Sequence, residues 1–383
     1  MNRPLHPADP TLLARVGAVA PILRGTLAEP SDSEDDKFRR VIVTRCAESG
    51  VPGTTDSGYL EMTALAADTA NDRTRAEFAA ALQRYRSQYG KGPDAVRVPG
   101  VGTFAVSRDP QEPTRPLANK VALVTGAAGA IGAGITRGLL EQGCRVAATD
   151  IAPGPLDEIV DELRAAFSPD RLAGVVMDVT DAGSVRHAFD AVADIWGGVD
   201  VVVVNAGIAM VAPLCEIAIE NFRRLERVNV EGTLLTLAEA GRVLMRQATG
   251  GDIVLVSTKN VFAPGAQFGA YSATKAASHQ LARIASLELA PHDIRVNMVA
   301  PDAVFSDGKR KSGLWAEVGP SRMKARGLDE KGLEEYYRSR NLLKARVTAT
   351  HVAHAVLFFV TRQTPTTGAT IPVDGGLPDA TPR

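Results

Sequence analysis

Short apolar stretches alternate with amphipathic segments along most of the chain. This alternation is typical of parallel strands joined by helices, because each crossover returns the chain to the same edge of one sheet. The expected strands are residues 121–124, 146–149, 174–177, 201–204, 253–256, 296–299 and 370–373. The pattern predicts an α/β fold, a doubly wound parallel sheet with helices on both faces and a ligand crevice at the carboxyl ends of its strands.

The first part of the chain has a different pattern. Residues 107–116 are rich in proline and charge and lack periodic apolar positions, so we interpret them as a linker. Before it we expect an acidic loop at 32–36, a short strand at 41–43 and a helix whose apolar face we expect to pack against the main domain rather than form a binding surface. The face of that helix carries Phe78, Leu82, Tyr85 and Tyr89. We predict an N-terminal extension with its linker at 1–115 and a second domain at 116–383.

Composition narrows the class of protein. The formal net charge of -1 gives no support for nucleic acid or an anionic membrane as a partner. The three cysteines, Cys46, Cys144 and Cys215, are scattered and lack metal-ligand spacing, which favours a reducing compartment. No apolar stretch approaches the length of a membrane span, and the N-terminus lacks the apolar core of a secretory signal. We expect a cytoplasmic protein without a metal.

A glycine-rich turn, Thr125–Gly132, separates the first expected strand from a helix that Gly143 is placed to end. Glycines at such a turn let backbone N–H groups approach a pyrophosphate, and the helix dipole favours the anion. Asp150 closes the next strand, where a carboxylate can accept hydrogen bonds from both ribose hydroxyls of an adenosine. The turn alone is weak evidence, but the order strand, turn, helix, strand and acid predicts a dinucleotide site.

Further polar or small residues follow the other strands. Asp178 either receives the adenine amino group or caps the segment that starts at Thr180. Asn205-Ala206-Gly207 either lets the backbone pass close to a cofactor ribose or forms a plain exit turn.

Tyr271 and Lys275 stand four residues apart in a helical segment that runs to about Ala290, so they share one helix face. An ammonium beside a phenol favours the phenolate, and a cationic nicotinamide would add to the effect. A tyrosine that normally titrates near ~10 would then become a base closer to neutral pH.

Together these motifs resemble the short-chain dehydrogenase/reductase family over about residues 119–377. In family order they are Thr125–Gly132, Asp178-Val179, Asn205-Ala206-Gly207, Asn229, Ser257-Thr258, Tyr271 with Lys275, Arg295-Val296-Asn297 and Val373–Gly376. The resemblance implies a Rossmann-like domain in which Tyr271 is the acid/base and Lys275 holds the nicotinamide ribose and lowers the pKa of Tyr271. It also implies that Asn229 supports a proton-relay water and that a strand-end hydroxyl polarises the substrate oxygen. The implied cofactor contacts are Gly126, Gly129, Ala130, Ile131, Gly132, Asp150, Asp178, Val179, Asn205, Ala206, Gly207, Tyr271, Lys275, Pro301 and Val304.

The sequence departs from the family pattern at two places. The family's usual interval before Tyr271 leads to Thr258 where a serine is normal, and Ser257 precedes it. We favour Thr258 as the catalytic hydroxyl, with Ser257 as the alternative, because a threonine hydroxyl donates the same hydrogen bond. Ala130 stands where the turn usually has its middle glycine, with Gly129 just before it. Alanine is small, so we expect pyrophosphate binding to survive.

We expect NAD as the cofactor. Asp150 would repel a 2′-phosphate and bind a free 2′-hydroxyl, and the turn offers no basic residue.

A closer resemblance is to the dehydrogenase half of bifunctional rhamnulose-1-phosphate aldolase/dehydrogenases. It is carried by Lys259-Asn260, 301–305, 336–338 and 342–344. In those proteins a class II aldolase precedes the reductase, and residues 98–105, with the stretches around 23–25 and 55–56, weakly resemble its end. Such an aldolase binds its metal through several histidines, whereas His6 is the only histidine before the linker. We therefore interpret the extension as a non-catalytic remnant, kept as a lid or an oligomer contact.

Residues 305–342 exceed a simple strand-to-helix connection and occupy the place of a substrate lid in the family, so we expect them to set specificity. Lys309-Arg310-Lys311 and Arg338-Ser339-Arg340 either meet a phosphate or carboxylate or form a solvated loop. Trp315 either walls the pocket or packs within the lid.

The expected function is an NAD-dependent oxidoreductase that interconverts a secondary alcohol and a ketone on a small polyhydroxylated substrate: a sugar, sugar alcohol, cyclitol or phosphate. The alternatives are a lactaldehyde-type dehydrogenase, an epimerase or lyase that recycles tightly held NAD, and a non-catalytic NAD-binding regulator. The presence of Asn229, Thr258, Tyr271 and Lys275 disfavours the regulator. The family also implies a homodimer or homotetramer formed through the Tyr271–Ala290 helix and its neighbour.

Overall fold

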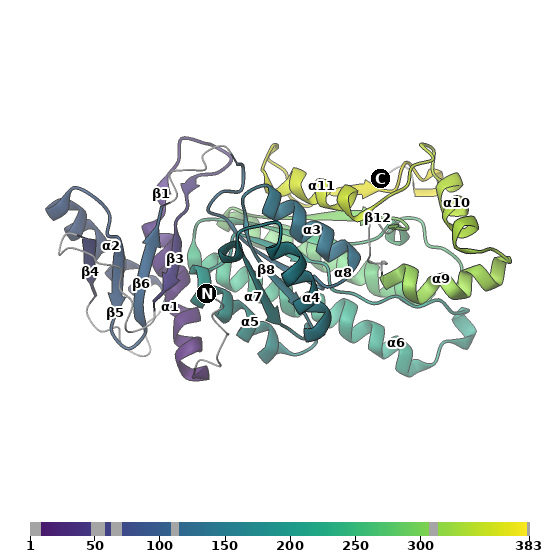
Figure 1. Ribbon diagram of the computed structural model, residues 1–383, viewed down its shortest axis with the longest axis horizontal. Helices are drawn as coiled ribbons and strands as arrows, with labels where there is room; N and C mark the ends of the chain where they lie inside the picture. Colours follow the sequence, from purple (N-terminus) through teal and green to yellow (C-terminus); the bar gives the residue numbers. More distant parts are fainter. Residues whose placement is uncertain (1–8, 47–57, 63–70, 109–114, 306–312, 381–383) are drawn as a thin grey trace.

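The computed structural model describes residues 9–46, 58–62, 71–108, 115–305 and 313–380. A seven-stranded sheet forms its centre, and a smaller four-stranded sheet lies at one end (Figure 1). The order across the large sheet is β13 (Thr370–Val373), β12 (Ile294–Pro301), β11 (Gly251–Val256), β10 (Val201–Val204), β7 (Val121–Thr125), β8 (Arg145–Asp150) and β9 (Leu172–Val176). All neighbours are parallel. Each strand expected from the sequence is present, most with slightly longer bounds.

Alternate side chains of the central strands enter two separate cores. Ala122 and Val124 pack with α3 (Ala130–Glu141), α4 (Pro153–Arg164) and α11 (Ala349–Val360) on one face. Val121 and Leu123 pack with α5 (Ala182–Trp196), α7 (Gly232–Gln247) and α8 (Gly269–Leu289) on the other. Strands buried on both faces read as continuous apolar runs, which explains why they stood out in the sequence. The α/β, Rossmann-like fold class is confirmed.

The N-terminal part forms its own small core. Its four-stranded sheet has the order β3 (Ile42–Arg45), β6 (Gly102–Ser107), β5 (Ala95–Val98) and β4 (Tyr59–Glu61), beside a two-stranded ribbon of β1 (Glu29–Pro30) and β2 (Phe38–Arg39). Helix α1 (Pro10–Leu27) contacts α2 (Asn71–Tyr89) on one side and α5 and α7 on the other (Figure 1). The extension is thus attached to the large sheet's helices through α1.

The expected packing of the second N-terminal helix was wrong. Phe78 and Leu82 of α2 are buried in a cluster with α1 and the small sheet, where Ala193 of α5 is the contribution from the main domain. Tyr89, the last residue of the stripe, is 37% exposed. The stripe therefore serves the core of the extension, and α1 makes the packing contact that the sequence had assigned to this helix.

Part of the expected linker lies outside the described residues, at 109–114. Directly after the expected linker, Leu117 is fully buried in the core of the main domain. The chain thus joins the reductase core several residues before β7 begins.

Buried charges join the extension to the amino ends of the large sheet's strands. Arg24 of α1 pairs with Asp200 at 2.6 Å, and Arg40 pairs with the same carboxylate at 2.9 Å. Burial alone would raise the pKa of Asp200, but the charges of Arg24 and Arg40 outweigh it and lower that pKa. Asp36, from the expected acidic loop, pairs with Arg40 and, at 2.8 Å, with Lys120. The acidic loop is therefore part of the interface between the two parts.

A second buried pair lies beside the first at this end of the sheet. Arg362 pairs with Asp252 at 2.9 Å and also donates a hydrogen bond to the backbone oxygen of Asp35.

No described helix has both the length and the apolar character that crossing a membrane requires.

Candidate active site

A cavity of about 780 Å³ opens at the carboxyl ends of the parallel strands, where the strand order reverses between β7 and β10. Open α/β sheets bind their ligands at this switch point. The cavity is lined by Gly126, Gly129, Ala130, Ile131, Gly132, Asp150, Asp178, Val179, Asn205, Ala206, Gly207, Thr258, Tyr271, Lys275, Pro301 and Val304. Of the expected site residues, Asn229 is not part of this lining. The fold thus brings side chains from most of the large sheet to one place.

The glycine-rich turn is shaped by close backbone contacts. Gly126 has a φ of +63°, and a Cβ there would lie 2.9 Å from the Cα of Ala206. A Cβ on Gly132 would lie 2.2 Å from the Gly126 oxygen. Asp150 accepts a hydrogen bond from the Ala128 N–H at 3.1 Å, which fixes the turn to the end of β8. This glycine cradle, with an acid beside it, fits the pyrophosphate and adenosine ribose of a dinucleotide.

Ala130 is accommodated without strain. It is the first residue of α3, lines the cavity and is 5% exposed. Gly129 has no neighbour closer to an added Cβ than the Gly126 oxygen at 3.5 Å. The exchange of alanine and glycine relative to the family pattern therefore leaves the cradle open.

The segment after β10 is tied to the turn and to α8. The Asn205 amide donates hydrogen bonds to the backbone oxygens of Thr125 and Gly126, at 2.9 and 3.0 Å. A Cβ on Gly207 would lie 3.1 Å from both the Asn229 Oδ1 and the Lys275 Nζ. The small residues here therefore allow close packing within the protein itself.

Asp178 does not cap the following helix. Its carboxylate accepts hydrogen bonds from the backbone and the hydroxyl of Thr180, both at 2.8 Å, whereas Asp181 caps α5 by accepting from the Ser184 N–H. Asp178 lines the cavity beside Val179. Asp178 thus holds the start of the segment at Thr180, as the capping interpretation expected, although the N-cap of α5 itself is Asp181.

Asn229 lies in a π-helical turn, Glu226–Glu231, between α6 (Ile219–Leu225) and α7. Single π turns inside helices are frequent at functional sites. The Asn229 amide accepts from the Ile208 N–H and donates to the Ile208 oxygen and to the Thr274 hydroxyl, each at 3.0 Å. Asn229 thus bridges the strand exit after β10 and the helix that carries Tyr271 and Lys275.

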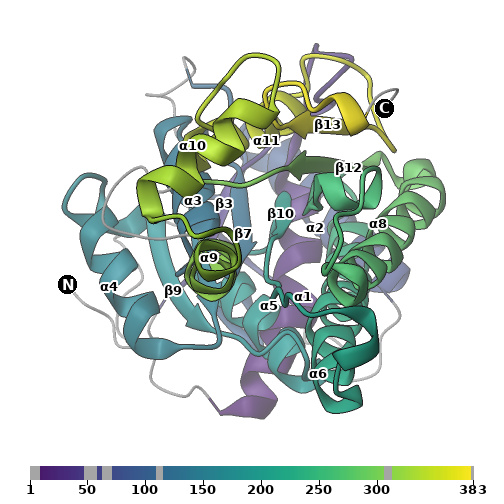
Figure 2. The same cartoon turned by 90° about the vertical axis from the view of Figure 1, so that its right-hand side faces the viewer.

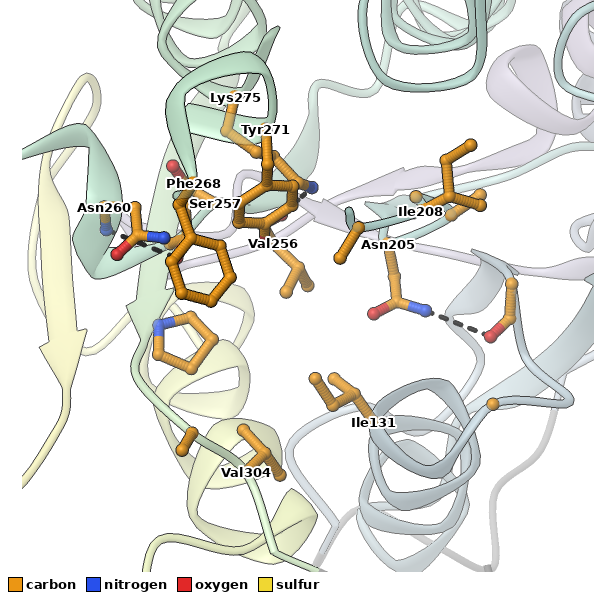
Figure 3. Close-up of a pocket in the computed structure, with 18 of the residues that line it drawn as sticks. Ile131, Asn205, Ile208, Val256, Ser257, Asn260, Phe268, Tyr271, Lys275 and Val304 are labelled. Atoms are coloured by element: carbon orange, nitrogen blue, oxygen red, sulfur yellow. Dashed lines mark hydrogen bonds between the residues drawn. The ribbon is translucent and has the colours of Figure 1, made fainter. Parts of the chain in front are cut away.

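Tyr271 and Lys275 lie one turn apart on α8, and the Tyr271 ring faces the cavity opposite Ile131 and Val304 (Figure 3). Lys275 Nζ donates a hydrogen bond to the Val256 oxygen at 3.1 Å, and burial lowers the pKa of Lys275 to about 8. Burial raises the pKa of Tyr271 to about 12, and a hydrogen bond with Thr258 acts in the opposite direction. The expectation that Lys275 lowers this pKa is not met by the protein alone, because burial is the largest contribution and Lys275 is not among the charges that act on Tyr271.

The two neighbouring hydroxyls after β11 have different partners. Thr258 forms a hydrogen bond with Tyr271, whereas Ser257 Oγ lies 2.9 Å from His279 Nδ1. Both side chains are buried and line the cavity. The contact with Tyr271 favours Thr258 as the hydroxyl that acts on the substrate oxygen.

The lid contains α9 (Gly313–Arg326) and α10 (Glu330–Arg340), which lie over the carboxyl edge of the sheet (Figure 2). The basic stretch 309–311 lies outside the described residues. Trp315 packs within the lid, with its ring centroid 5.1 Å from Phe305 and 5.7 Å from Tyr337, and it is not part of the cavity lining. Arg340 lines the cavity, whereas Arg338 pairs with Glu335 at 3.0 Å.

Sequence reasoning assigned no role to several charged and aromatic residues of the cavity. These are Arg224, Lys259, Phe268, Asp302, Arg322, Arg326, Tyr336, Tyr337 and Asp379. Arg322 and Arg326 stand four apart on α9, a spacing that could have indicated a shared face. Lys259 and Asp302 influence each other's charge: burial lowers the pKa of Lys259 and raises that of Asp302, and each partner acts in the opposite sense.

Comparison with known proteins agrees with this geometry. The family model of the short chain dehydrogenases matches residues 120–317. The chain therefore belongs to the short-chain dehydrogenase/reductase family. It is an oxidoreductase that acts on CH–OH groups and uses a nicotinamide cofactor.

Similar proteins include the oxidoreductase YuxG of Bacillus subtilis (strain 168), which is 36% identical over 272 residues. That match spans 71% of this chain but 39% of the Bacillus protein. The sorbitol dehydrogenase of Cereibacter sphaeroides is 35% identical over 52% of this chain and 76% of its own. Among solved structures, the sorbitol-6-phosphate 2-dehydrogenase SrlD of Erwinia amylovora has a TM-score of 0.62 and 26% identity, covering 67% of this chain and 98% of that one.

Proposed function

We propose that the protein is an NAD-dependent dehydrogenase that interconverts a secondary alcohol and a ketone on a small polyhydroxylated compound: a sugar, sugar alcohol, cyclitol or a phosphate of one. The observation that carries this proposal is the arrangement of Thr258, Tyr271 and Lys275 on one wall of the cavity. The similarity to a sorbitol dehydrogenase supports the substrate class.

The dinucleotide would be held by the glycine cradle, Asp150 and the strand exits after β9 and β10. When bound, the nicotinamide accepts or donates a hydride. Asp150 lies in the cavity at the end of β8, where its carboxylate favours a ribose with a free 2′-hydroxyl. NAD is therefore the proposed cofactor, and a higher kcat/KM with NADP would contradict this choice.

The protein's own groups would divide the proton chemistry among them. Thr258 donates a hydrogen bond to the substrate oxygen, and Tyr271 takes the proton from the substrate hydroxyl during oxidation. Lys275, with a pKa of about 8, is mostly charged at neutral pH and would supply positive charge beside the nicotinamide ribose. Asn229 positions α8 through Thr274 and, as in the family, supports the relay that carries the proton away.

The test is to measure NADH formation by absorbance across a panel of polyols, sugar phosphates and hydroxyaldehydes, with Tyr271→Phe as the control. Oxidation of a polyol by the wild type and its loss in the variant are expected. A preference for a hydroxyaldehyde would favour a lactaldehyde-type dehydrogenase instead. Turnover of a substrate without net NADH release would favour an epimerase or lyase. NAD binding without any difference between wild type and variant would indicate a regulator.

For residues 1–115 we propose a non-catalytic extension related to the end of a class II aldolase, preceding a catalytic domain at 116–383. The sequence resemblance supports this, and the matched Bacillus protein is much longer than the matched stretch. His6 is the single histidine of this segment in the sequence, which is too few for such an aldolase's metal. A measurable aldol cleavage of a ketose phosphate by the purified protein would contradict the assignment.

We also propose a homodimer or homotetramer formed through α8 and α7. Leu234, Ile284 and Leu287 on these helices are large apolar side chains with 50%, 42% and 73% exposure. Such a patch favours contact with another surface. Sedimentation showing only monomer would count against it.

A further inference from the structure

The lid half of the cavity carries more positive than negative charge. Arg322, Arg326 and Arg340 line it from α9 and α10, and Lys259 lines it from the segment after β11. Facing them in the lining are the carboxylates of Asp302 and Asp379. Asp302 and Asp379 favour the ammonium of Lys259, together with Asp374 outside the lining, and Asp302 is also within reach of the charge of Arg340. At least two guanidinium groups are thus left without a compensating carboxylate.

Arg322 gives the strongest indication of a bound ligand among these residues. It is 9% exposed, its guanidinium lies 4.7 Å from the Phe268 ring centroid, and one Nη donates a weak hydrogen bond to the Ala266 oxygen at 3.3 Å. Its Nε is buried without a hydrogen-bond partner. A buried donor without a partner costs free energy. For Arg322, which lines the cavity, a ligand in that cavity would supply the missing acceptor.

The other two arginines converge on a single tyrosine. Arg326 lies over the Tyr336 ring at 4.6 Å and donates a hydrogen bond to its hydroxyl at 3.3 Å, and Arg340 lies 5.9 Å from the same ring. Arg340 also lies 5.3 Å from the Tyr337 ring. Stacking on aromatic faces fixes the guanidinium planes and leaves their N–H edges available for hydrogen bonds.

No ion pair involves any of these three arginines among the residues that the structure describes. Elsewhere in the chain, the buried guanidinium groups of Arg24, Arg40 and Arg362 all pair with carboxylates. Unpaired arginines that are fixed by stacking and face a cavity are suited to a bidentate oxyanion.

We propose that α9 and α10 form a subsite for an oxyanion of the substrate, a phosphate or carboxylate group distant from the reacting CH–OH. This inference rests on the proposed function, since it names the substrate class of the same cavity. Tyr271 lies on α8 and Thr258 follows β11, whereas the arginines come from the lid, so an anionic end held by the lid would direct the carbinol toward the two hydroxyls. In this arrangement α9 and α10 of the lid select the substrate, whereas Thr258 binds the substrate oxygen and Tyr271 carries out the proton transfer.

The first experiment measures kcat/KM with NAD for matched substrates: neutral polyols, their phosphate monoesters and the corresponding hydroxy acids. We expect the anionic members to be favoured by about tenfold or more over the neutral ones. Arg322→Gln and Arg326→Gln should reduce this anionic-to-neutral ratio by about 10- to 100-fold, mainly through KM, the loss expected for a hydrogen bond to a charged group. The comparison of phosphates with hydroxy acids identifies which oxyanion is preferred.

Arg338→Gln is the matched control. Arg338 lies on α10 near Arg340 but pairs with Glu335 and does not line the cavity, so its replacement should leave the ratio unchanged. An equal preference of the wild type for neutral and anionic alcohols, or an equal loss with both in the Arg322 and Arg326 variants, would overturn the subsite and leave the proposed dehydrogenase intact.

A second measurement does not depend on turnover. Inorganic phosphate and acetate are titrated calorimetrically into the wild type, Arg322→Gln and Arg338→Gln, with thermal unfolding to verify that each variant is folded. Binding of either anion that is lost in Arg322→Gln and kept in Arg338→Gln supports the subsite even if no alcohol in the panel reduces NAD, which would be the failure of the proposed function. Binding that is absent, or equal in all three proteins, overturns the subsite.

Discussion

At the amino end of the large sheet, Arg24, Arg40 and Asp200 are buried in direct contact, whereas at the carboxyl end Lys275 and Lys259 are buried with no ion pair to any described residue. The pKa values move in opposite senses. In the cluster of Arg24, Arg40 and Asp200, opposite charges outweigh burial, raising the pKa of Arg40 and lowering that of Asp200. Burial prevails at the neighbouring Asp252, whose pKa is raised despite its pair with Arg362. At the carboxyl end burial prevails, lowering the pKa of Lys275 and raising that of Tyr271.

This difference separates structural from chemical use of the same residue types. Groups whose charge is secured by partners do not change protonation near neutral pH, so they can hold the extension onto the sheet. Burial without an opposite charge brings the pKa of Lys275 to about 8, close to neutral pH, and raises that of Tyr271 to about 12. Such perturbed pKa values are typical of sites of proton transfer. One sheet thus has a structural charged end, which faces the extension, and a reactive end, which faces α9 and α10 (Figure 1).

Removing the phenol should have the largest effect. Tyr271→Phe is expected to lower kcat by about 10²–10⁴-fold, since it removes the group that transfers the proton, while the thermal unfolding midpoint stays close to the wild-type value. Steady-state NADH formation and a thermal melt measure the two quantities. More than a tenth of wild-type kcat in the variant would show that the carboxyl end does not act through Tyr271.

Removing a charge from the buried network at the amino end of the large sheet should lower stability and leave kcat unchanged. Arg24→Met leaves the buried Asp200 with one guanidinium partner fewer and should lower the free energy of unfolding by about 3–5 kcal/mol, measured by urea denaturation. The kcat of the folded fraction should be unchanged. Arg15→Met is the control, because Arg15 is an exposed residue of the same helix. Equal stability of the two variants would contradict a structural role for the network.

The two hydroxyls after β11 offer a finer test within the reactive end. Thr258→Ala should lower kcat by about 10²-fold through the loss of one donor to the substrate oxygen. Ser257→Ala should have a smaller effect, since Ser257 contacts His279 rather than Tyr271. The ratio of the kcat values of the two variants identifies the catalytic hydroxyl. A larger loss of kcat in Ser257→Ala would assign that role to Ser257 instead of Thr258.

Acid should destabilise the ion pairs of Asp36 at the amino end of the large sheet. Burial raises the pKa of Asp36, but the charges of Arg40 and Lys120 outweigh it and bring that pKa to about 2. Because the pKa of Asp36 is lower in the folded than in the unfolded protein, its ionisation adds about 2 kcal/mol to the free energy of unfolding. This contribution is complete above about pH 4 and is lost as pH falls toward 2. Urea denaturation at pH 5 and pH 2.5 should therefore show a smaller pH-dependent loss in Asp36→Asn than in wild type. Parallel losses would contradict the coupling.

The parts of the structure that the sequence predicted depend on local patterns. The strands of the large sheet are buried on both faces, so their apolar runs were visible, and the spacing of Tyr271 and Lys275 follows from one helix. The contacts that were not predicted join distant segments. Arg24 and Asp200 are 176 residues apart, and nothing near either residue indicates the other.

The lid and the π turn show the same limit. The sequence indicated that residues 305–342 cover the site, but the choice of Arg322 and Arg326 over Arg338 depends on how α9 and α10 pack. Asn229 could be named from the family pattern. Its place in a π turn depends on contacts with Ile208 and Thr274, which lie on other elements.

The π-helical turn at Glu226–Glu231 makes the length of this segment as important as its composition. A π turn holds one residue more than the α-helical turn it interrupts. Deleting one residue beside Asn229 would close this wide turn into regular α-helix and shift the backbone position of Asn229. Asn229 would then lose its bonds to Ile208 and Thr274 although no contact residue had been replaced. In alignments of related chains, a one-residue gap in this stretch therefore deserves more weight than a substitution.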